Sequence, residues 1–155
     1  MVRAARNRIA RVALASDHAG FAYKEKTKRF LIELGVPWKD FGTHTPEPVD
    51  YPDVAHVAAM AISSGEFKRG IFICGSGIGM SIVANKHIGV RAAACESPAA
   101  AELSRLHNDA NVLCFGERLV SWPRAKKMIL LFLNTKADSG RHARRVRKIH
   151  TLTSC

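Results

Sequence analysis

Residues 70–79 read GIFICGSGIG, a short apolar run followed by glycines at positions 75, 77 and 79. The run Gly70–Cys74 is typical of a buried strand, because it is short, continuous and bounded by glycine. The alternate glycines predict a turn whose bare backbone a ligand can approach. We expect a helix to follow as far as about Lys86, so this stretch predicts one strand–loop–helix unit.

The same alternation continues in both directions along the chain. The expected strands are Arg11–Ser16, Val36–Phe41, Gly70–Cys74, Val90–Cys95 and Val112–Phe115. The expected helices outside the first unit are Gly20–Leu34, Pro52–Ser63, Ser97–Leu106, Trp122–Leu133 and a basic segment near Arg141–Ile149. Strands separated by helices imply βαβ crossovers, and therefore an α/β fold with a five-stranded parallel sheet. Ligands of such sheets bind beyond the carboxyl ends of the strands.

Length and composition narrow the class of protein. The chain has 155 residues, of which 47% are hydrophobic and 24% charged. This is enough apolar material for the core of one domain, and it excludes a wholly disordered chain. No apolar run approaches the roughly 18 residues that cross a bilayer. The apolar stretch near the N-terminus is interrupted by Arg11 and is too short for a signal peptide. We therefore predict a cytoplasmic protein without membrane contact.

The net charge of +11 is concentrated at the two ends of the chain. We treat residues 1–10 as a basic N-terminal extension and residues 136–155 as a basic C-terminal helix and tail. Nucleic-acid binders usually spread basic residues over a folded face and add aromatic side chains for stacking. Aromatic residues make up only 7% of this chain. The pattern favours a small anionic ligand, and we predict no nucleic-acid partner.

The four cysteines are Cys74, Cys95, Cys114 and Cys155. They contain no C-x-x-C pair, which argues against a zinc ribbon or a thioredoxin motif. Three of them end apolar runs, where cysteine is usually a small buried hydrophobe. We expect no disulfide framework.

Polar and titratable residues stand next to the expected strands. They are Asp17, His18, His107, Asn108, Asp109, Glu117 and Arg118, together with the segment Cys74–Gly79. We expect all of them to gather at one edge of the sheet. At the centre, the N–H groups that open a helix can hold a phosphate or a developing enediolate, and they also stabilise a thiolate. Cys74 is therefore a candidate base, although a tight turn with a buried cysteine would explain the same residues.

For each of the other candidate residues, a purely structural role would also explain its presence. Asp17 and His18 could simply cap a helix, and Tyr51 could serve packing. His107 could interact with a helix dipole, although histidine is the usual proton carrier near neutral pH. Arg141 and Arg145 lie four residues apart, so on a helix they could clamp a phosphate or form a solvated basic face.

Taken together, these residues resemble a known family, the type B ribose-5-phosphate isomerases. The matching strings are SDHAG (16–20), DYP (50–52), ICGSGIGMS (73–81), ANK (84–86), GVRA (89–92), LSRLHNDAN (103–111) and GRH (140–142) with Arg145. They occur in order over residues 11–149. The resemblance implies a single isomerase domain spanning residues 1–155, with a Rossmann-like three-layer sandwich and a C-terminal helix that reaches a partner subunit. It also implies a homodimer or homotetramer with shared active sites, and neither a metal nor an organic cofactor.

The resemblance also implies a role for each matching residue. The reaction would be an aldose–ketose isomerisation of D-ribose 5-phosphate and D-ribulose 5-phosphate in the pentose phosphate pathway. Catalysis would fall to Cys74 as base, Ser76 as its support, and His107 as the ring-opening group assisted by Asp17. The residues implied to bind substrate are His18, Tyr51, Gly75, Gly77, Ile78, Gly79, Asn108, Arg118, Arg141 and Arg145.

The sequence departs from the family pattern at two positions. Ser76 stands where many relatives carry threonine, which preserves the hydroxyl. Ala99 stands where relatives often have a bulkier residue, which changes the expected pocket wall. A six-carbon substrate, allose or galactose 6-phosphate, therefore stays open as an alternative. A non-catalytic phosphate- or nucleotide-binding module is a further alternative, although it would have no need for Cys74 and His107.

Overall fold

The computed structural model describes residues 10–155, and the extension predicted for residues 1–10 lies outside this range except for its last residue. The strands are β1 (Val12–Ser16), β2 (Trp38–Asp40), β3 (Arg69–Cys74), β4 (Ala92–Ala94) and β5 (Val112–Gly116). The helices are a short 3-10 turn η1 (His18–Gly20), α1 (Phe21–Glu33), α2 (Tyr51–Ser63), α3 (Ile78–Ala84), α4 (Pro98–Asn108), α5 (Trp122–Asn134) and α6 (Arg141–Thr153).

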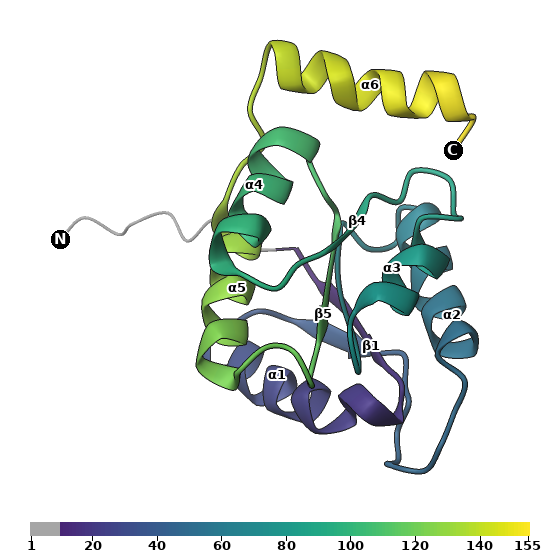
Figure 1. The fold of residues 1–155 in the computed structure, drawn as a ribbon, viewed down its shortest axis with the longest axis vertical. Coiled ribbons are helices and arrows are strands. Elements are labelled where there is room, and N and C mark those ends of the chain that lie inside the picture. The colour runs from purple at the N-terminus through teal and green to yellow at the C-terminus, as the bar shows by residue number, and fades with distance from the viewer. Residues whose placement is uncertain (1–9) are drawn as a thin grey trace, which may run out of the picture.

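The five strands form one parallel sheet in the order β2-β1-β3-β5-β4. Helices cover both faces, with α1, α4 and α5 on one side and α2 and α3 on the other (Figure 1). The three central strands are buried along almost their whole length, as expected for a sheet covered on both faces. This confirms the α/β, Rossmann-like three-layer fold predicted from the sequence.

Two hydrophobic clusters hold the layers together. Leu14, Ile71 and Leu113 point toward α1, α4 and α5, whereas Phe72 and Cys114 point toward α2 and α3. This division follows from the strand period of two, because successive side chains face opposite sides of the sheet. The alternation fixes which residues of β3 can reach a ligand at its end.

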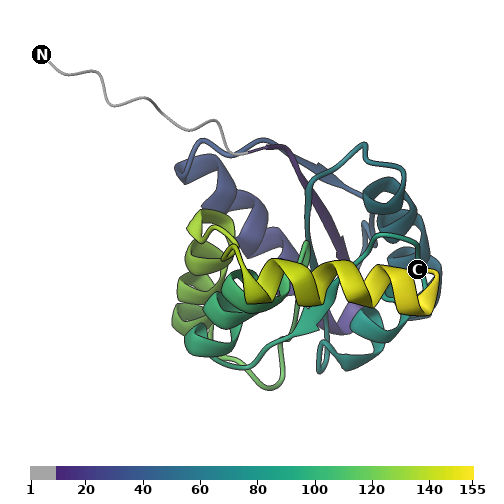
Figure 2. The same cartoon turned by 90° about the horizontal axis from the view of Figure 1, so that it is seen from above.

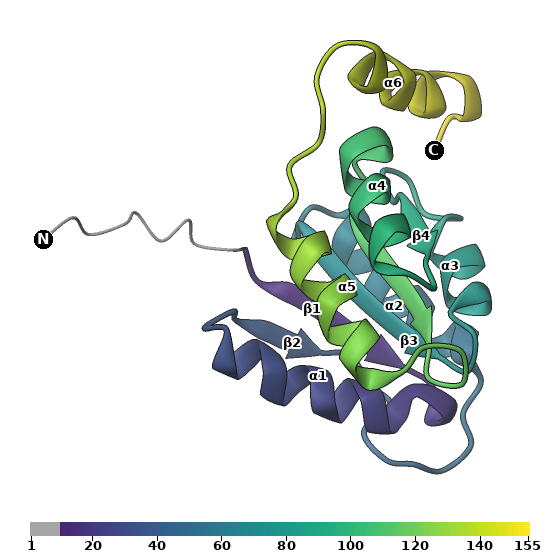
Figure 3. The same cartoon turned by 60° about the vertical axis from the view of Figure 1, so that its left-hand side comes forward.

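Helix α6 differs from the other helices because it has no buried residue. It follows α5 after a linker and lies across the end of the molecule where α4 finishes, near β4 (Figures 1 and 2). Figure 3 shows the same helix standing apart from the sheet, with α1 and β2 at the opposite side of the molecule. The prediction that this helix reaches a partner subunit stays a prediction.

Several element bounds differ from those expected. Strand β4 is three residues long, because Arg91 directs its N–H to the side chain of Asn111. At the free edge of the strand, the side-chain amide of Asn85 bonds both backbone groups of Ala92. Helix α3 ends at Ala84 rather than near Lys86, and α6 extends to Thr153 rather than Ile149.

No helix within residues 10–155 combines the length and the apolar character that a membrane crossing requires.

Candidate active site

Cys74 ends β3 at the carboxyl edge of the sheet. Its side chain is 5% exposed, and its Sγ accepts the backbone N–H of Gly77 at 3.0 Å. This hydrogen bond joins the end of β3 to the glycine loop that follows it. The loop therefore holds the sulfur at a fixed place while Gly75 and Ser76 beside it are partly exposed.

The loop can take this path only because position 77 is glycine. Gly77 has a φ of +81°, and a Cβ there would lie 2.6 Å from the Cα of Phe115. Any side chain would therefore clash with β5 as well as strain the backbone. One residue earlier, the Ser76 Oγ accepts the N–H of Ile78 at 3.2 Å, which fixes the hydroxyl at the start of α3.

Two larger side chains lie against the glycine loop. A Cβ at Gly79 would lie 2.8 Å from the ring of Tyr51, and one at Gly75 would lie 3.1 Å from the guanidinium of Arg118. The glycines thus leave space that these two side chains occupy. A phenol and a guanidinium flank the loop, as a polar anionic ligand would require.

Asp17 and His18 follow β1, which neighbours β3 in the sheet. Asp17 is nearly buried, and its Oδ1 accepts the N–H of Gly20 at 3.0 Å, so it caps the following turn. His18 is exposed, and its Nδ1 lies 3.2 Å from both the N and the O of Val49. This contact ties the histidine to the loop that precedes Tyr51.

His107, Asn108 and Asp109 do not join this group, so the expectation that all the polar residues gather at one edge is wrong. They lie at the end of α4, and a helix that follows a parallel strand runs back to the opposite edge of the sheet. The register shows the separation, because Gly70 pairs with Val112 at that edge and Cys74 pairs with Gly116 at the other. Four residue steps along a strand span about 13 Å.

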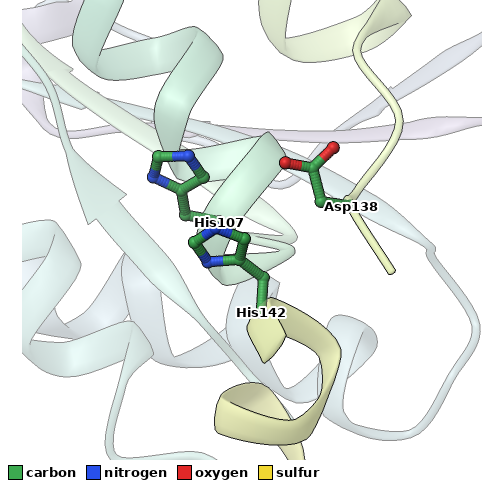
Figure 4. A group of neighbouring side chains, drawn as sticks. All are labelled: His107, Asp138 and His142. Carbon is green, nitrogen blue, oxygen red and sulfur yellow. The ribbon is translucent and has the colours of Figure 1, made fainter. Parts of the chain in front are cut away.

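The second edge has a cluster of its own. The rings of His107 and His142 stack with centroids 4.1 Å apart and an angle of 6° between their planes (Figure 4). Asp138 is exposed beside them, with its backbone N–H bonded to the O of Leu106 at 2.9 Å. His107 and His142 line a cavity of about 220 Å³.

Desolvation lowers the pKa of His142, and the neighbouring His107 and Arg141 lower it further. Asp138 acts in the opposite direction but does not reverse the shift. These effects favour the neutral form of His142 more than in a free imidazole.

The ligand atoms of His107, Asp138 and His142 all lie within 4.8 Å of one another, a donor set that zinc accepts. The stack does not suit chelation, because imidazole lone pairs lie in the ring plane. One ion cannot lie in the planes of two parallel rings at once, so this pair of histidines is arranged for stacking and not for binding a metal ion.

The structure thus divides the predicted site residues into two sets. The set near Cys74 contains Asp17, His18, Tyr51, Cys74, Gly75, Ser76, Gly77, Ile78, Gly79 and Arg118. The set at the opposite edge contains His107, Asn108, Arg141 and Arg145. Within one chain, the predicted assistance of His107 by Asp17 does not occur.

Two residues that lie beside His107 were not predicted as site residues from the sequence. They are Asp138 and His142. The only signal was that Asp138 is the single acid among the basic residues 136–155. Spacing could not place these residues beside His107, because the linker between α5 and α6 has no periodic pattern.

The comparisons with known proteins all point to one family of sugar isomerases. Residues 12–149 match a family model described as Ribose/Galactose Isomerase. The ribose-5-phosphate isomerase B of Escherichia coli (strain K12) is 45% identical over 139 residues, which cover 90% of this chain and 93% of the relative.

A 4-deoxy-4-sulfo-D-erythrose isomerase of Clostridium sp. (strain MSTE9) is 46% identical over 126 residues, covering 81% of this chain and 79% of that protein. Among solved structures, the ribose-5-phosphate isomerase B of Clostridium thermocellum superposes with a TM-score of 0.91 at 45% identity. The match covers 93% of this chain and 97% of that one.

Proposed function

The chain belongs to the ribose/galactose isomerase family, and from this membership and the geometry of Cys74 we propose that it interconverts D-ribose 5-phosphate and D-ribulose 5-phosphate. The reaction is an aldose–ketose isomerisation of the pentose phosphate pathway, and it runs through an enediolate. The observation that carries the proposal is the Cys74 sulfur, held by the N–H of Gly77 at the mouth of a glycine loop.

In the proposed reaction the Cys74 thiolate removes the proton from C2 of the open-chain aldose. The electrons left on carbon form the enediolate, and the proton returns to C1 while a hydroxyl proton moves from O2 to O1. Backbone N–H groups within the segment Gly75–Gly79 stabilise the charge that develops on oxygen. The Ser76 hydroxyl, fixed by Ile78, supports the base.

The sugar arrives mainly as a furanose, so the ring has to open before the base can act. We assign this step to His107, which takes the proton from the hydroxyl on C1 and supplies one to the ring oxygen as the C1–O4 bond breaks. A histidine is suited to both transfers near neutral pH. Asn108, next to it, and Tyr51, from the other set, are proposed to contact the sugar.

The phosphate is proposed to bind between positive groups of both sets. His18 and Arg118 lie near the glycine loop, and Arg141 and Arg145 lie in α6. Remote binding of this doubly charged group would orient the reacting carbons toward Cys74.

One chain does not bring these groups together, and this supports a site shared between two chains. His107 and Cys74 lie at opposite edges of one sheet, so a second copy has to bring its His107 edge to the first copy's Cys74 edge. We therefore propose a homodimer, or a tetramer built from such dimers, in which Asp17 of one chain faces His107 of the other. Two-fold symmetry then gives two identical sites.

The predicted absence of a metal and an organic cofactor fits this proton chemistry, which needs neither. A cytoplasmic location is proposed from the same metabolic role and from the sequence.

The five-carbon substrate is favoured over the six-carbon alternatives and over a non-catalytic module. The E. coli relative and the C. thermocellum structure are both named for ribose 5-phosphate and match over 93% and 97% of their lengths, and both names describe an isomerase. The relative named for a four-carbon sulfonated sugar matches over 79% of its length. The test compares kcat/KM of the purified chain on D-ribose 5-phosphate, allose 6-phosphate, galactose 6-phosphate and D-erythrose 4-phosphate. The proposal expects the highest value for ribose 5-phosphate, and a preference for another sugar would overturn it.

A further inference from the structure

The second cluster contains a histidine to which neither the sequence nor the proposed reaction gives a task. His142 is the second residue of α6, and it meets His107 in the last turn of α4. We propose that His142 is a positioning residue, whose flat ring is a platform that holds His107 in the orientation needed for ring opening. The inference rests on the proposed function.

The geometry of the stack supports this role. Parallel rings with centroids 4.1 Å apart restrict the rotation of His107 about its side-chain bonds. The contact covers one face of the His107 ring, whereas the ring nitrogens transfer protons within the ring plane and so are not covered by the stack. Small misplacements of a reacting group can cost about 10²-fold in rate, so a platform of this kind has a measurable effect.

The charge of the platform also suits the chemistry. His107 becomes cationic whenever it accepts a proton, and a second cation stacked on it would oppose that change. The groups around His142 are His107, Arg141, Arg145 and Asp138, and their combined effect with desolvation favours its uncharged form. A neutral aromatic face is attractive to a cation placed above it.

The linker that precedes α6 fixes the platform in place. Asp138 donates its N–H to the O of Leu106, one residue before His107. This bond joins the linker to the last turn of α4, and Gly140 then starts α6 with a positive φ of 67°. His142 therefore reaches His107 through a short, anchored segment.

The test uses two reactions that differ in their need for ring opening. Conversion of ribose 5-phosphate needs it, whereas exchange of the C1 proton of open-chain ribulose 5-phosphate with D2O needs only Cys74 and the enediolate. His142→Ala should lower kcat/KM for ribose 5-phosphate roughly 10- to 100-fold while changing the exchange rate by less than about threefold. His142→Phe keeps a flat ring and should restore conversion to within about threefold of the original chain.

The matched control is Lys148→Ala, an exposed position of the same helix, which should change neither rate. A phenylalanine variant as slow as the alanine variant would overturn the platform role. So would an equal loss of conversion and exchange, which would indicate a defect in phosphate binding or folding.

A readout without turnover separates this inference from the proposed function. Stacking places the His107 ring protons in the shielding cone of His142, so their NMR resonances, assigned by their loss in His107→Asn, should move downfield in His142→Ala. If the His107 resonances did not move in His142→Ala while the original chain was active, the stacking role of His142 would be overturned and the proposed function would stand. Absence of turnover in the original chain would overturn the proposed function.

Discussion

Gly77 donates its backbone N–H to the Sγ of Cys74 over 3.0 Å, and the same glycine packs directly against β5. A Cβ added at Gly77 would lie only 2.6 Å from the Cα of Phe115. One residue thus fixes the sulfur and allows the loop to pass the neighbouring strand. The relationship explains how a run of small residues, in which only Cys74 and Ser76 carry side chains with a proposed catalytic role, can be the centre of the site.

Gly77→Ala tests this double constraint. The substitution adds the strain of a positive φ and a clash with strand backbone, so it should lower the free energy of unfolding by about 3 kcal/mol or more. Gly65→Ala is the matched control, because Gly65 has a φ of +82° and nothing within 4 Å of its Cβ position. The control should lose only about 1 kcal/mol in urea unfolding. Equal losses in the two variants would show that the contact between Gly77 and the backbone of Phe115 is not tight.

Cys74→Ala tests the base. Loss of a general base typically costs about 10²- to 10⁴-fold in rate, and here both ribose 5-phosphate conversion and C1 proton exchange should fall by this amount. Binding of inorganic phosphate should persist, because the glycine loop and the arginines remain. Cys155→Ala, at a partly exposed cysteine with no role in the proposed reaction, is the control and should keep full activity. An alanine variant that still exchanges the C1 proton would remove Cys74 from the mechanism.

His107→Ala tests the ring-opening step. Conversion of ribose 5-phosphate should fall by about 10²-fold, whereas C1 proton exchange of ribulose 5-phosphate should stay within about threefold. The comparison uses exchange because kcat/KM in the two directions of one equilibrium must fall together. His56→Ala removes an exposed histidine of α2 and should leave both rates unchanged. A parallel fall in exchange would assign His107 to the enediolate step instead.

Asp40→Ala tests a buried ion pair at the end of β2, on the Cys74 edge of the sheet. The Nζ of the fully buried Lys24 lies 2.5 Å from Asp40 Oδ2, and Asp40 Oδ1 accepts the N–H of Gly42. Removing one partner leaves a buried charge with only the Glu25 carboxylate nearby, so the loss should be about 3 kcal/mol at pH 7. Glu66→Ala, which breaks the exposed pair with Lys39, should cost less than about 0.5 kcal/mol.

The same pair predicts a pH dependence. Burial alone would raise the pKa of Asp40, but the hydrogen bonds from Lys24 and Gly42 outweigh it, and the pKa lies below the ordinary value of 3.8. A lowered carboxylate pKa stabilises the fold above 3.8, and this stabilisation is lost as the pH falls through the lower value in the folded state. The difference in unfolding free energy between the original chain and Asp40→Ala should therefore be constant near neutral pH and shrink below about pH 4. A difference that stays constant down to pH 2 would contradict the ion pair.

The sequence predicted the fold well where local patterns decide the structure. The apolar run ending at Cys74 and the glycines after it allowed β3 and α3 to be placed. The bounds of α1, α2, α4 and α5 were found within one or two residues, whereas α6 is four residues longer than predicted. Strand β4 was predicted too long, because side chains of Asn85 and Asn111 satisfy backbone groups that an apolar pattern cannot identify.

The sequence predicted the site less completely, because the direction of helix α4 and contacts between residues far apart in the chain also determine it. Cys74, Asp17 and His18 follow strands and were placed at the correct edge. His107 lies at the end of a helix, and helices of this fold run opposite to the strands, so it belongs to the other edge. His142 reaches His107 only through the linker after α5, and no local pattern reports such a contact.

The central claim is that one active site combines Cys74 of one chain with His107 of another. Mixing inactive Cys74→Ala and His107→Ala chains, after mild denaturation and refolding together, tests it directly. Random pairing makes half of the dimers mixed, and each mixed dimer holds one site with both residues intact, so about a quarter of the original ribose 5-phosphate activity should return. A mixture no more active than its two components would contradict the shared site.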